Sequence, residues 1–195
     1  MKLHKTAIAF ILLAPFSSPA FAQSVGTEVQ RDINQETRIE QGLQSGQLST
    51  GEAARLERGE ARIDRMESKG LKDGTLSPQE AARIQRAQNR ESAQINRLEN
   101  NAVTGNPNSP SSQRMQADVQ RNINQQRRIE QGVQSGALTN KEAAKLERGQ
   151  ARVDRAEARA GADGRISPRE QARIQHKENQ QSKRIFREKH NRRTR

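Results

Sequence analysis

Residues 49–69 combine apolar and charged positions with the period of an α-helix, since three kinds of residue recur at spacings of three and four. The first row is apolar, the second basic and the third acidic: Leu56, Gly59, Ile63 and Met66; Arg55, Arg58, Arg62 and Arg65; Glu57, Glu60, Asp64 and Glu67. The rows return 90 residues later as Leu146, Gly149, Val153 and Ala156; Lys145, Arg148, Arg152 and Arg155; Glu147, Gln150, Asp154 and Glu157. The pattern predicts one long three-striped helix in each half of the chain.

Four helix starts carry a capping box, in which a Ser or Thr is followed three residues later by Glu. The pairs are Ser49 and Glu52, Ser77 and Glu80, Thr139 and Glu142, Ser167 and Glu170. Together with the apolar spacing elsewhere, they predict helices at about 24–41, 50–69, 78–100, 113–131, 140–159 and 168–191. Gly42 is expected to end the first helix in a left-handed conformation.

The chain repeats itself without a gap over 90 residues, so that Ile33, Gly42, Asp64 and Pro78 recur as Ile123, Gly132, Asp154 and Pro168. We therefore expect an all-α fold made of two tandem copies of a three-helix module. The expected boundaries are 23–101 for the first module, 102–112 for a flexible linker rich in Asn, Pro, Ser and Gly, and 113–195 for the second module with its basic tail.

The striped helix has two interpretations. In the first interpretation, its apolar row packs on the other helices of its own module and its charged rows are solvated. Alternatively, the two charged rows of opposite sign support self-association or binding of a partner helix through Leu56, Gly59, Ile63 and Met66.

Residues 1–22 have the pattern of a secretory signal peptide. Lys2 and Lys5 precede an apolar run over residues 7–16, and Ala20-Phe21-Ala22 favours cleavage after Ala22. The run is too short to span a bilayer. We expect an exported protein located in the periplasm, with the extracellular medium as the alternative.

Composition limits the classes of function. The net charge of +12 becomes +10 once Lys2 and Lys5 are removed, and the chain has no Cys, Trp or Tyr. Cysteine ligands and disulfides are thereby excluded. No Ser/His/Asp arrangement or His cluster is apparent, because His176 and His190 lie far apart in a basic helix. We expect a thin core and a non-catalytic protein without a cofactor.

Two loops resemble the second half of a calcium-binding EF-hand loop, with an acidic residue, a glycine and a final glutamate. The candidate ligands are Asp73 and Glu80 in one loop and Asp163 and Glu170 in the other. Aligned on the glutamate, the first ligand position is Lys69 or Arg159, which repels a cation. The alternative is that the glutamate caps a helix and the loop is a connector.

The C-terminal segment favours binding of a polyanion such as lipopolysaccharide, anionic lipid or DNA. Its basic residues are Lys183, Arg184, Arg187, Lys189, Arg192, Arg193 and Arg195, next to Phe186. Nothing in the segment resembles a base-reading motif. A solvated basic end that keeps the protein in solution is the alternative.

A resemblance to a family of small exported proteobacterial proteins with helical repeats is carried by four segments: Arg38 to Gly42, Glu52 to Arg65, Asp73 to Glu80 and Arg184 to Asn191. The helix starts are also similar to those of periplasmic chaperones of the Spy/CpxP type, and the loops resemble helix connectors of EF-hand and TerB-like domains. These resemblances imply export and a chaperone-like protein that binds unfolded or envelope proteins. Polyanion binding and calcium binding are the alternative functions.

Overall fold

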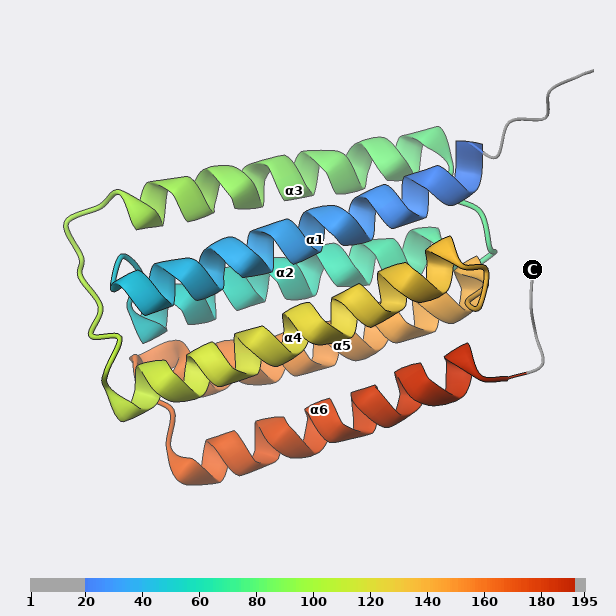
Figure 1. The fold of residues 1–195 in the computed structure, drawn as a ribbon. Coiled ribbons are helices and arrows are strands. Elements are labelled where there is room, and N and C mark those ends of the chain that lie inside the picture. The colour runs from blue at the N-terminus through green and yellow to red at the C-terminus, as the bar shows by residue number, and fades with distance from the viewer. Residues whose placement is uncertain (1–19, 192–195) are drawn as a thin grey trace, which may run out of the picture.

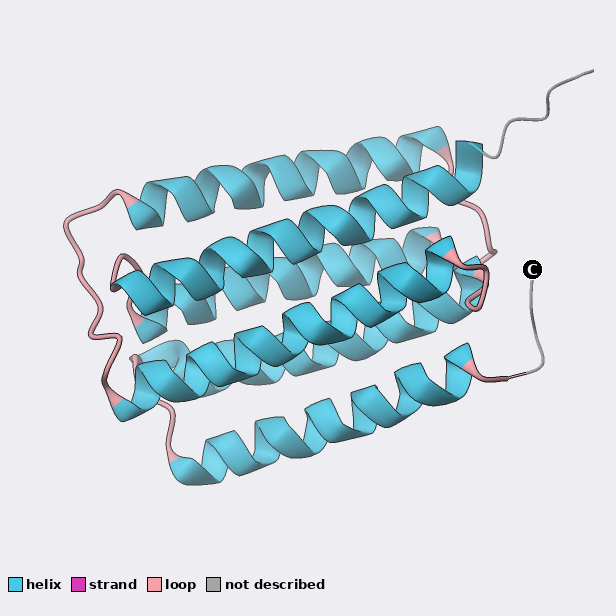
Figure 2. Ribbon diagram, viewed as in Figure 1, coloured by secondary structure: helices cyan, strands magenta, loops and turns pink. Residues whose placement is uncertain are grey.

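The computed structural model describes residues 20–191, with side chains from Val25 onward. Residues 1–19 of the predicted signal peptide lie outside this range, as do Arg192, Arg193 and Arg195 of the predicted basic tail. The helices are α1 (Ala20–Ser45), α2 (Thr50–Gly70), α3 (Pro78–Glu99), α4 (Pro110–Gln134), α5 (Asn140–Ala160) and α6 (Pro168–Lys189), with a 3₁₀ turn η1 (Gly161–Asp163). Figure 2 shows only helices and loops over the described residues, which confirms the all-α prediction.

The four predicted helix starts are confirmed. Ser49, Ser77, Thr139 and Ser167 each accept the backbone N–H of the glutamate three residues ahead, and that glutamate accepts the backbone N–H of the cap residue. Each reciprocal pair satisfies two backbone donors that a helix N-terminus leaves free. Local sequence therefore fixes where α2, α3, α5 and α6 begin.

The predicted role of Gly42 is wrong. Helix α1 continues through Gly42 to Ser45, and Gly46 is the left-handed residue, with φ of 80°. A Cβ on Gly42 would lie 2.6 Å from Cδ1 of Leu48, so this glycine admits the leucine that precedes α2. The predicted helix end is four residues too early because Gly42, which is needed for close packing, precedes Gly46, which is needed for the turn.

The bundle is built mainly from helix pairs that join the two halves of the chain. The most extensive packing is that of α2 on α5 and of α1 on α4, and both pairs are antiparallel. Figure 1 shows α3 along one edge beside α1 and α2, and α6 along the opposite edge beside α4 and α5. A division into two separate three-helix modules is not confirmed, because the largest interfaces lie between the halves.

The segment between α3 and α4 is attached to the α1–α2 turn. The backbone N–H of Gly105 donates to the carbonyl of Gly46 at 2.7 Å, and Nδ2 of Asn101 donates to Oε1 of Glu52 at 2.7 Å. Helix α4 begins at Pro110 after the cap residue Ser109, three residues before the predicted start at residue 113.

The apolar core forms two clusters, one that extends from one end of the bundle to Ile33 and Ile123 at the middle of α1 and α4, and one toward the other end. One cluster includes Ile39, Leu43, Leu56 and Met115, and the other includes Leu71, Ile84, Ile129 and Leu138. Because each cluster takes residues from both halves, burial of apolar area holds the halves together. None of the helices within residues 20–191 is long and apolar enough to cross a membrane.

Candidate metal centre

Beside the two apolar clusters, the interior of the bundle is lined by carboxyl groups. All six helices contribute to this carboxylate core, and each of its residues is at most 8% exposed. Its members are Asp32, Glu36, Glu57, Glu60, Asp64, Glu67, Glu91, Asp118, Glu147, Asp154, Glu157 and Glu178. Across residues 25–191, no lysine or arginine is buried.

The expectation that both charged rows of the striped helix are solvated is therefore wrong for the acidic row. Helix α2 contacts α1, α3, α4 and α5, so neighbours cover a wide arc of its surface. The apolar row and the acidic row both fall within that arc, while Arg55, Arg58, Arg62 and Arg65 remain exposed. The same holds on α5, where Glu147, Asp154 and Glu157 are each at most 1% exposed.

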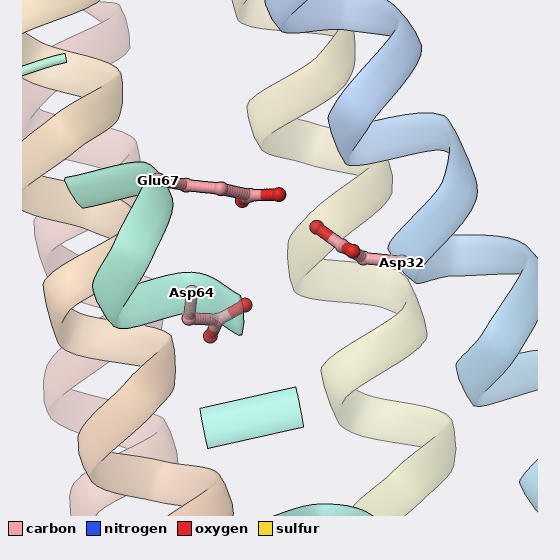
Figure 3. Close-up of side chains that lie close together, drawn as sticks. All are labelled: Asp32, Asp64 and Glu67. Carbon is pink, nitrogen blue, oxygen red and sulfur yellow. The ribbon is translucent and has the colours of Figure 1, made fainter. Parts of the chain in front are cut away.

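Two groups of three carboxylates are close enough to share an ion. The first is Asp32 of α1 with Asp64 and Glu67 of α2, and Figure 3 shows these side chains extending from the two helices into the space between them. The second is Glu36 of α1 with Glu57 of α2 and Asp154 of α5. In each triad, one oxygen from every residue lies within 4.8 Å of the others.

This spacing suits a cation with oxygen ligands. Calcium–oxygen distances are about 2.3–2.6 Å, so two oxygens on one ion stand at most about 5 Å apart. The oxygens of both triads fall within that limit. The donor set consists of carboxylates without imidazole or thiolate, which favours hard cations such as Ca²⁺, Mn²⁺ or a trivalent ion over Zn²⁺ or Cu²⁺.

Many oxygens of the carboxylate core have no hydrogen-bond donor. Both carboxylate oxygens of Glu57 and of Glu60 are buried and unpaired, as is one oxygen each of Asp32, Asp64 and Glu67. Buried polar atoms are normally paired, and an ionised carboxylate without a counter-charge is strongly unfavourable. These oxygens therefore need either protons or cations.

Amide side chains supply the few donors. Nε2 of Gln88 donates to Oδ1 of Asp32 at 2.9 Å and to Oε1 of Glu67 at 3.2 Å. Nδ2 of Asn122 donates to Oε2 of Glu157 at 2.8 Å. The carbonyl oxygens of Gln88 and Asn122 are themselves buried and unpaired, so they are further neutral ligands for a hard cation.

The environment raises the pKa of every member of the carboxylate core. Burial is the main cause and neighbouring carboxylates add to it at most positions; the pKa rises to about 7 for Asp32 and Asp154 and to about 8 for Glu147. The pKa values of Glu36, Glu57, Glu60 and Asp64 rise well above their ordinary range for the same two reasons. Glu178 is the member with an ion pair, to Nη1 of Arg121 at 3.2 Å, yet burial still raises its pKa to about 7.

The two halves differ in acidity at equivalent positions. Asp32, Glu36, Glu60 and Glu91 correspond, by the shift of 90, to Asn122, Gln126, Gln150 and Gln181. The counterpart of each triad therefore has only two carboxylates: Asp154 and Glu157 in one case, Glu147 and Asp64 in the other. The repeat gives both halves a similar helical framework, but five of the six triad carboxylates come from the first half of the chain.

The predicted EF-hand-like ligands lie in a different place. Oε2 of Glu80 accepts the backbone N–H and the hydroxyl of Ser77, and Glu170 does the same with Ser167. Oδ1 of Asp73 accepts the backbone N–H of Thr75, and Oδ1 of Asp163 accepts that of Arg165. The hydrogen bonds from Ser77 and Ser167 hold the pKa values of Glu80 and Glu170 below their usual range. Among the described residues, none of these four carboxylates belongs to a group of three.

The predicted polyanion site is described in part. Lys183, Arg184 and Arg187 of α6 line a solvent-open depression of about 740 Å³ together with Arg128 of α4 and the 56% exposed Phe186. Lys189 is partly buried, and burial lowers its pKa. His176 and His190 are exposed and lie outside the carboxylate core.

The apolar row proposed for self-association lies inside the chain. Leu56 and Ile63 are 0% and 2% exposed, and Met66 packs against the apolar cluster at one end of the bundle. The space at Gly59 is filled by the carboxylate of Glu91, with which a Cβ would overlap.

Sequence reasoning did not find the carboxylate core. The signal was present, since the acidic row of α2 continues the helical period of the apolar row next to it and Asp32 and Glu36 are four apart on α1.

Comparison with protein-family models, with curated proteins and with solved structures finds no match.

Proposed function

We propose that this protein binds hard multivalent cations in its carboxylate core. The supporting observation is the pair of buried carboxylate triads, Asp32/Asp64/Glu67 and Glu36/Glu57/Asp154, whose unpaired oxygens share the interior with no lysine or arginine among the described residues. We infer that the two tandem three-helix copies work as one unit here, because the second triad takes ligands from both halves.

The buried carboxylates would sequester the cation from solvent. A cation entering the core replaces protons on the carboxyl groups and neutralises the negative charge that their departure leaves in the buried interior. Ligands on α1, α2 and α5 hold one ion, so binding also ties these helices together and stabilises the folded chain.

Calorimetric titration of the chelator-treated protein tests the proposal, using Ca²⁺, Mn²⁺ and La³⁺ at pH 7. We expect two ions per chain, one for each triad. We also expect a rise in melting temperature and a heat that changes with the ionisation enthalpy of the buffer, because protons are released.

Paired variants locate the ions. Asp64→Asn with Glu67→Gln removes charge from the first triad, and Glu36→Gln with Glu57→Gln removes it from the second; each pair should abolish one binding event. The matched control is Asp73→Asn with Asp163→Asn, which removes two charges from the predicted loop ligands and should change nothing. Loss of binding in the control alone, or no uptake of any of the three cations by the unmodified chain, contradicts the proposal.

The chaperone-like function stays a prediction. Its apolar row is buried within the chain, and Val103 and Phe186 are the exposed large apolar residues among residues 25–191. Client binding would therefore depend on surfaces other than the row that suggested it.

A further inference from the structure

The outer face of the α2–α5 pair carries two facing rows of arginine. The rows are Arg58, Arg62 and Arg65 on α2 and Arg152, Arg155 and Arg159 on α5; we call the groove between them the arginine trough. All six are exposed except Arg155, which is partly exposed. The carboxylate core lies on the opposite side of the same two helices.

The trough is a continuous depression. Two adjoining hollows of about 350 and 490 Å³ share Arg65 and Arg155. Their floor is made of small side chains, namely Ala61 and Ser68 on α2 and Ala151 and Ala158 on α5. Lys69 and Arg148 extend the cationic lining beyond Arg65 and Arg152.

Among the described residues, none of these guanidinium groups forms an ion pair, although Arg62 is near enough to Glu91 to lower the pKa of that carboxyl group. The ion pairs of residues 25–191 involve Arg38 and Arg121, which lie on α1 and α4. No carboxylate lines either hollow. Facing rows of like charge repel each other, so an anion lying between them would relieve that repulsion.

The surroundings narrow the class of anion. Arginine pairs with phosphate through two parallel hydrogen bonds, which favours a phosphate-bearing ligand. The trough has no aromatic side chain on which a nucleic-acid base could stack. The exposed large apolar residues of the described chain, Val103 and Phe186, lie on other elements, so the acyl chains of a lipid find no apolar surface here.

The length of the trough favours a linear polymer over a single phosphate group. Arg58 and Lys69 are eleven residues apart on one helix, which corresponds to about 16 Å at 1.5 Å per residue. Cations occur along both walls over this distance, at spacings of three or four residues, or about 5–6 Å. An unbranched chain of phosphates without bases or acyl groups meets these conditions.

We propose that the arginine trough binds inorganic polyphosphate. The contact is electrostatic and made along the polymer, with guanidinium groups from α2 and α5 on its two sides. This site is separate from the basic segment of α6 that the sequence singled out, and its occupancy does not depend on the carboxylate core.

Fluorescence anisotropy with end-labelled, long-chain polyphosphate tests the site on the full chain, in a buffer with chelator so that no metal bridges protein and polymer. The trough variant is Arg62→Gln, Arg65→Gln, Arg152→Gln and Arg155→Gln. The matched control is Arg83→Gln, Arg86→Gln, Arg90→Gln and Arg97→Gln, which removes the same charge from exposed positions on α3. A third variant, Lys183→Gln, Arg184→Gln and Arg187→Gln, removes the described tail cations.

We expect the trough variant to weaken binding by about tenfold or more and to lower the slope of log affinity against log salt by about 3, because four phosphate contacts are lost. The α3 control and the tail variant should change affinity far less. Equal losses in the trough variant and the α3 control would overturn the proposal, since they indicate a response to net charge only. A loss confined to the tail variant would also overturn it.

Competition identifies the polymer. Unlabelled polyphosphate should displace the probe at lower phosphate concentration than single-stranded DNA or vesicles of anionic phospholipid. If DNA or the vesicles compete better and this advantage is lost in the trough variant, the occupant is a nucleic acid or a membrane and the polyphosphate proposal is wrong. Circular dichroism of each variant checks that the helices remain folded.

Discussion

Gly59 and Gly149 occupy the interior faces of α2 and α5, where each makes room for a polar side chain. The carboxylate of Glu91 fills the space at Gly59, and the amide of Gln181 fills that at Gly149. A missing side chain thus lets α3 and α6 send polar groups into the bundle, and a larger residue would collide with groups that have little room to move.

Gly59→Ala should lower the free energy of unfolding by about 1–3 kcal/mol, because the new Cβ overlaps the Glu91 carboxylate. Gly26→Ala on α1 is the control, since its Cβ would meet only Cγ of Gln134 at 3.9 Å. Removing a helical glycine there should stabilise by about 0.5–1 kcal/mol. Urea denaturation followed by circular dichroism measures both changes, and equal stability of the two variants would contradict the packing argument.

Glu60→Gln should stabilise the cation-free protein at pH 7–8 by about 1–3 kcal/mol. Both carboxylate oxygens of Glu60 are buried without a donor, and burial together with Asp32 and Glu91 raises the pKa of Glu60. A neutral amide avoids both the burial of an unpaired charge and the uptake of the proton that would neutralise it. The chain already accepts glutamine at the equivalent position, because Gln150 is 1% exposed.

Denaturation in the presence of chelator measures this effect. Glu130→Gln on the partly exposed surface of α4 is the control and should alter stability little. If Glu60→Gln destabilised the cation-free chain, the ionised form of Glu60 would have an interaction that its buried, unpaired oxygens do not reveal.

The helices owe their limits to local sequence and their rotation to packing. Capping boxes fix the starts of α2, α3, α5 and α6 in the same way in both halves. Which stripe of each helix faces inward depends on how many neighbours cover it, and α2 and α5 have neighbours over two of their three stripes. Helix periodicity was therefore a good guide to extent and a poor guide to burial.

Thr139→Ala should lower stability by about 1 kcal/mol, because the Thr139 hydroxyl caps α5 at the backbone N–H of Glu142 and also donates to its carboxylate. Thr139→Ser keeps the hydroxyl, so its free energy of unfolding is expected to fall by only about 0.3 kcal/mol. Thermal melts of the two variants at one pH provide the comparison. Equal losses in both would show that packing of the threonine methyl group, and not the cap, is responsible.

At the scale of the whole molecule, the interior of the bundle combines two apolar clusters with a buried carboxylate core. The apolar clusters supply the driving force for folding, whereas the carboxylate core opposes folding whenever it is charged. Cations or protons in the core remove that opposition. The stability of the whole chain should therefore respond to pH and to metal together.

Without cations, the free energy of unfolding should fall as the pH rises from about 4 to about 8. The pKa is about 7 for Asp32, Glu91, Asp154 and Glu178 and about 8 for Asp118 and Glu147, against about 4 in an unfolded chain. The folded state binds more protons across this interval, so each of these groups stabilises the fold fully below pH 4 and loses that contribution as the pH passes its folded-state pKa.

Melting temperatures between pH 4 and pH 9, with chelator and again with saturating Ca²⁺ or La³⁺, measure this dependence. Bound cations should flatten the curve, because they replace the protons. Below about pH 4 stability should also fall, since Glu80 and Glu170 have lowered pKa values and lose their capping interactions when protonated. Stability that rises steadily from pH 5 to pH 8 in the presence of chelator would contradict the assignment of a proton-binding core.

The sequence by itself determined the helices. Capping boxes, apolar spacing and the 90-residue repeat are local or periodic signals, and they placed six helices with ends within about four residues of those observed. Ser49, Thr139 and their glutamates act as predicted because a cap needs only residues three positions away.

Only the tertiary structure decided what the acidic row does. The sequence predicts a solvated stripe on α2 when the helix is considered within its own module. In the structure α5 and α1 cover this stripe, so its four residues are buried: Glu57, Glu60, Asp64 and Glu67. Pairing of α2 with α5 depends on burial of apolar clusters that join distant parts of the chain, which no local pattern encodes. The physical reason is that capping is a property of adjacent residues, whereas burial of a charge is a property of everything packed around it.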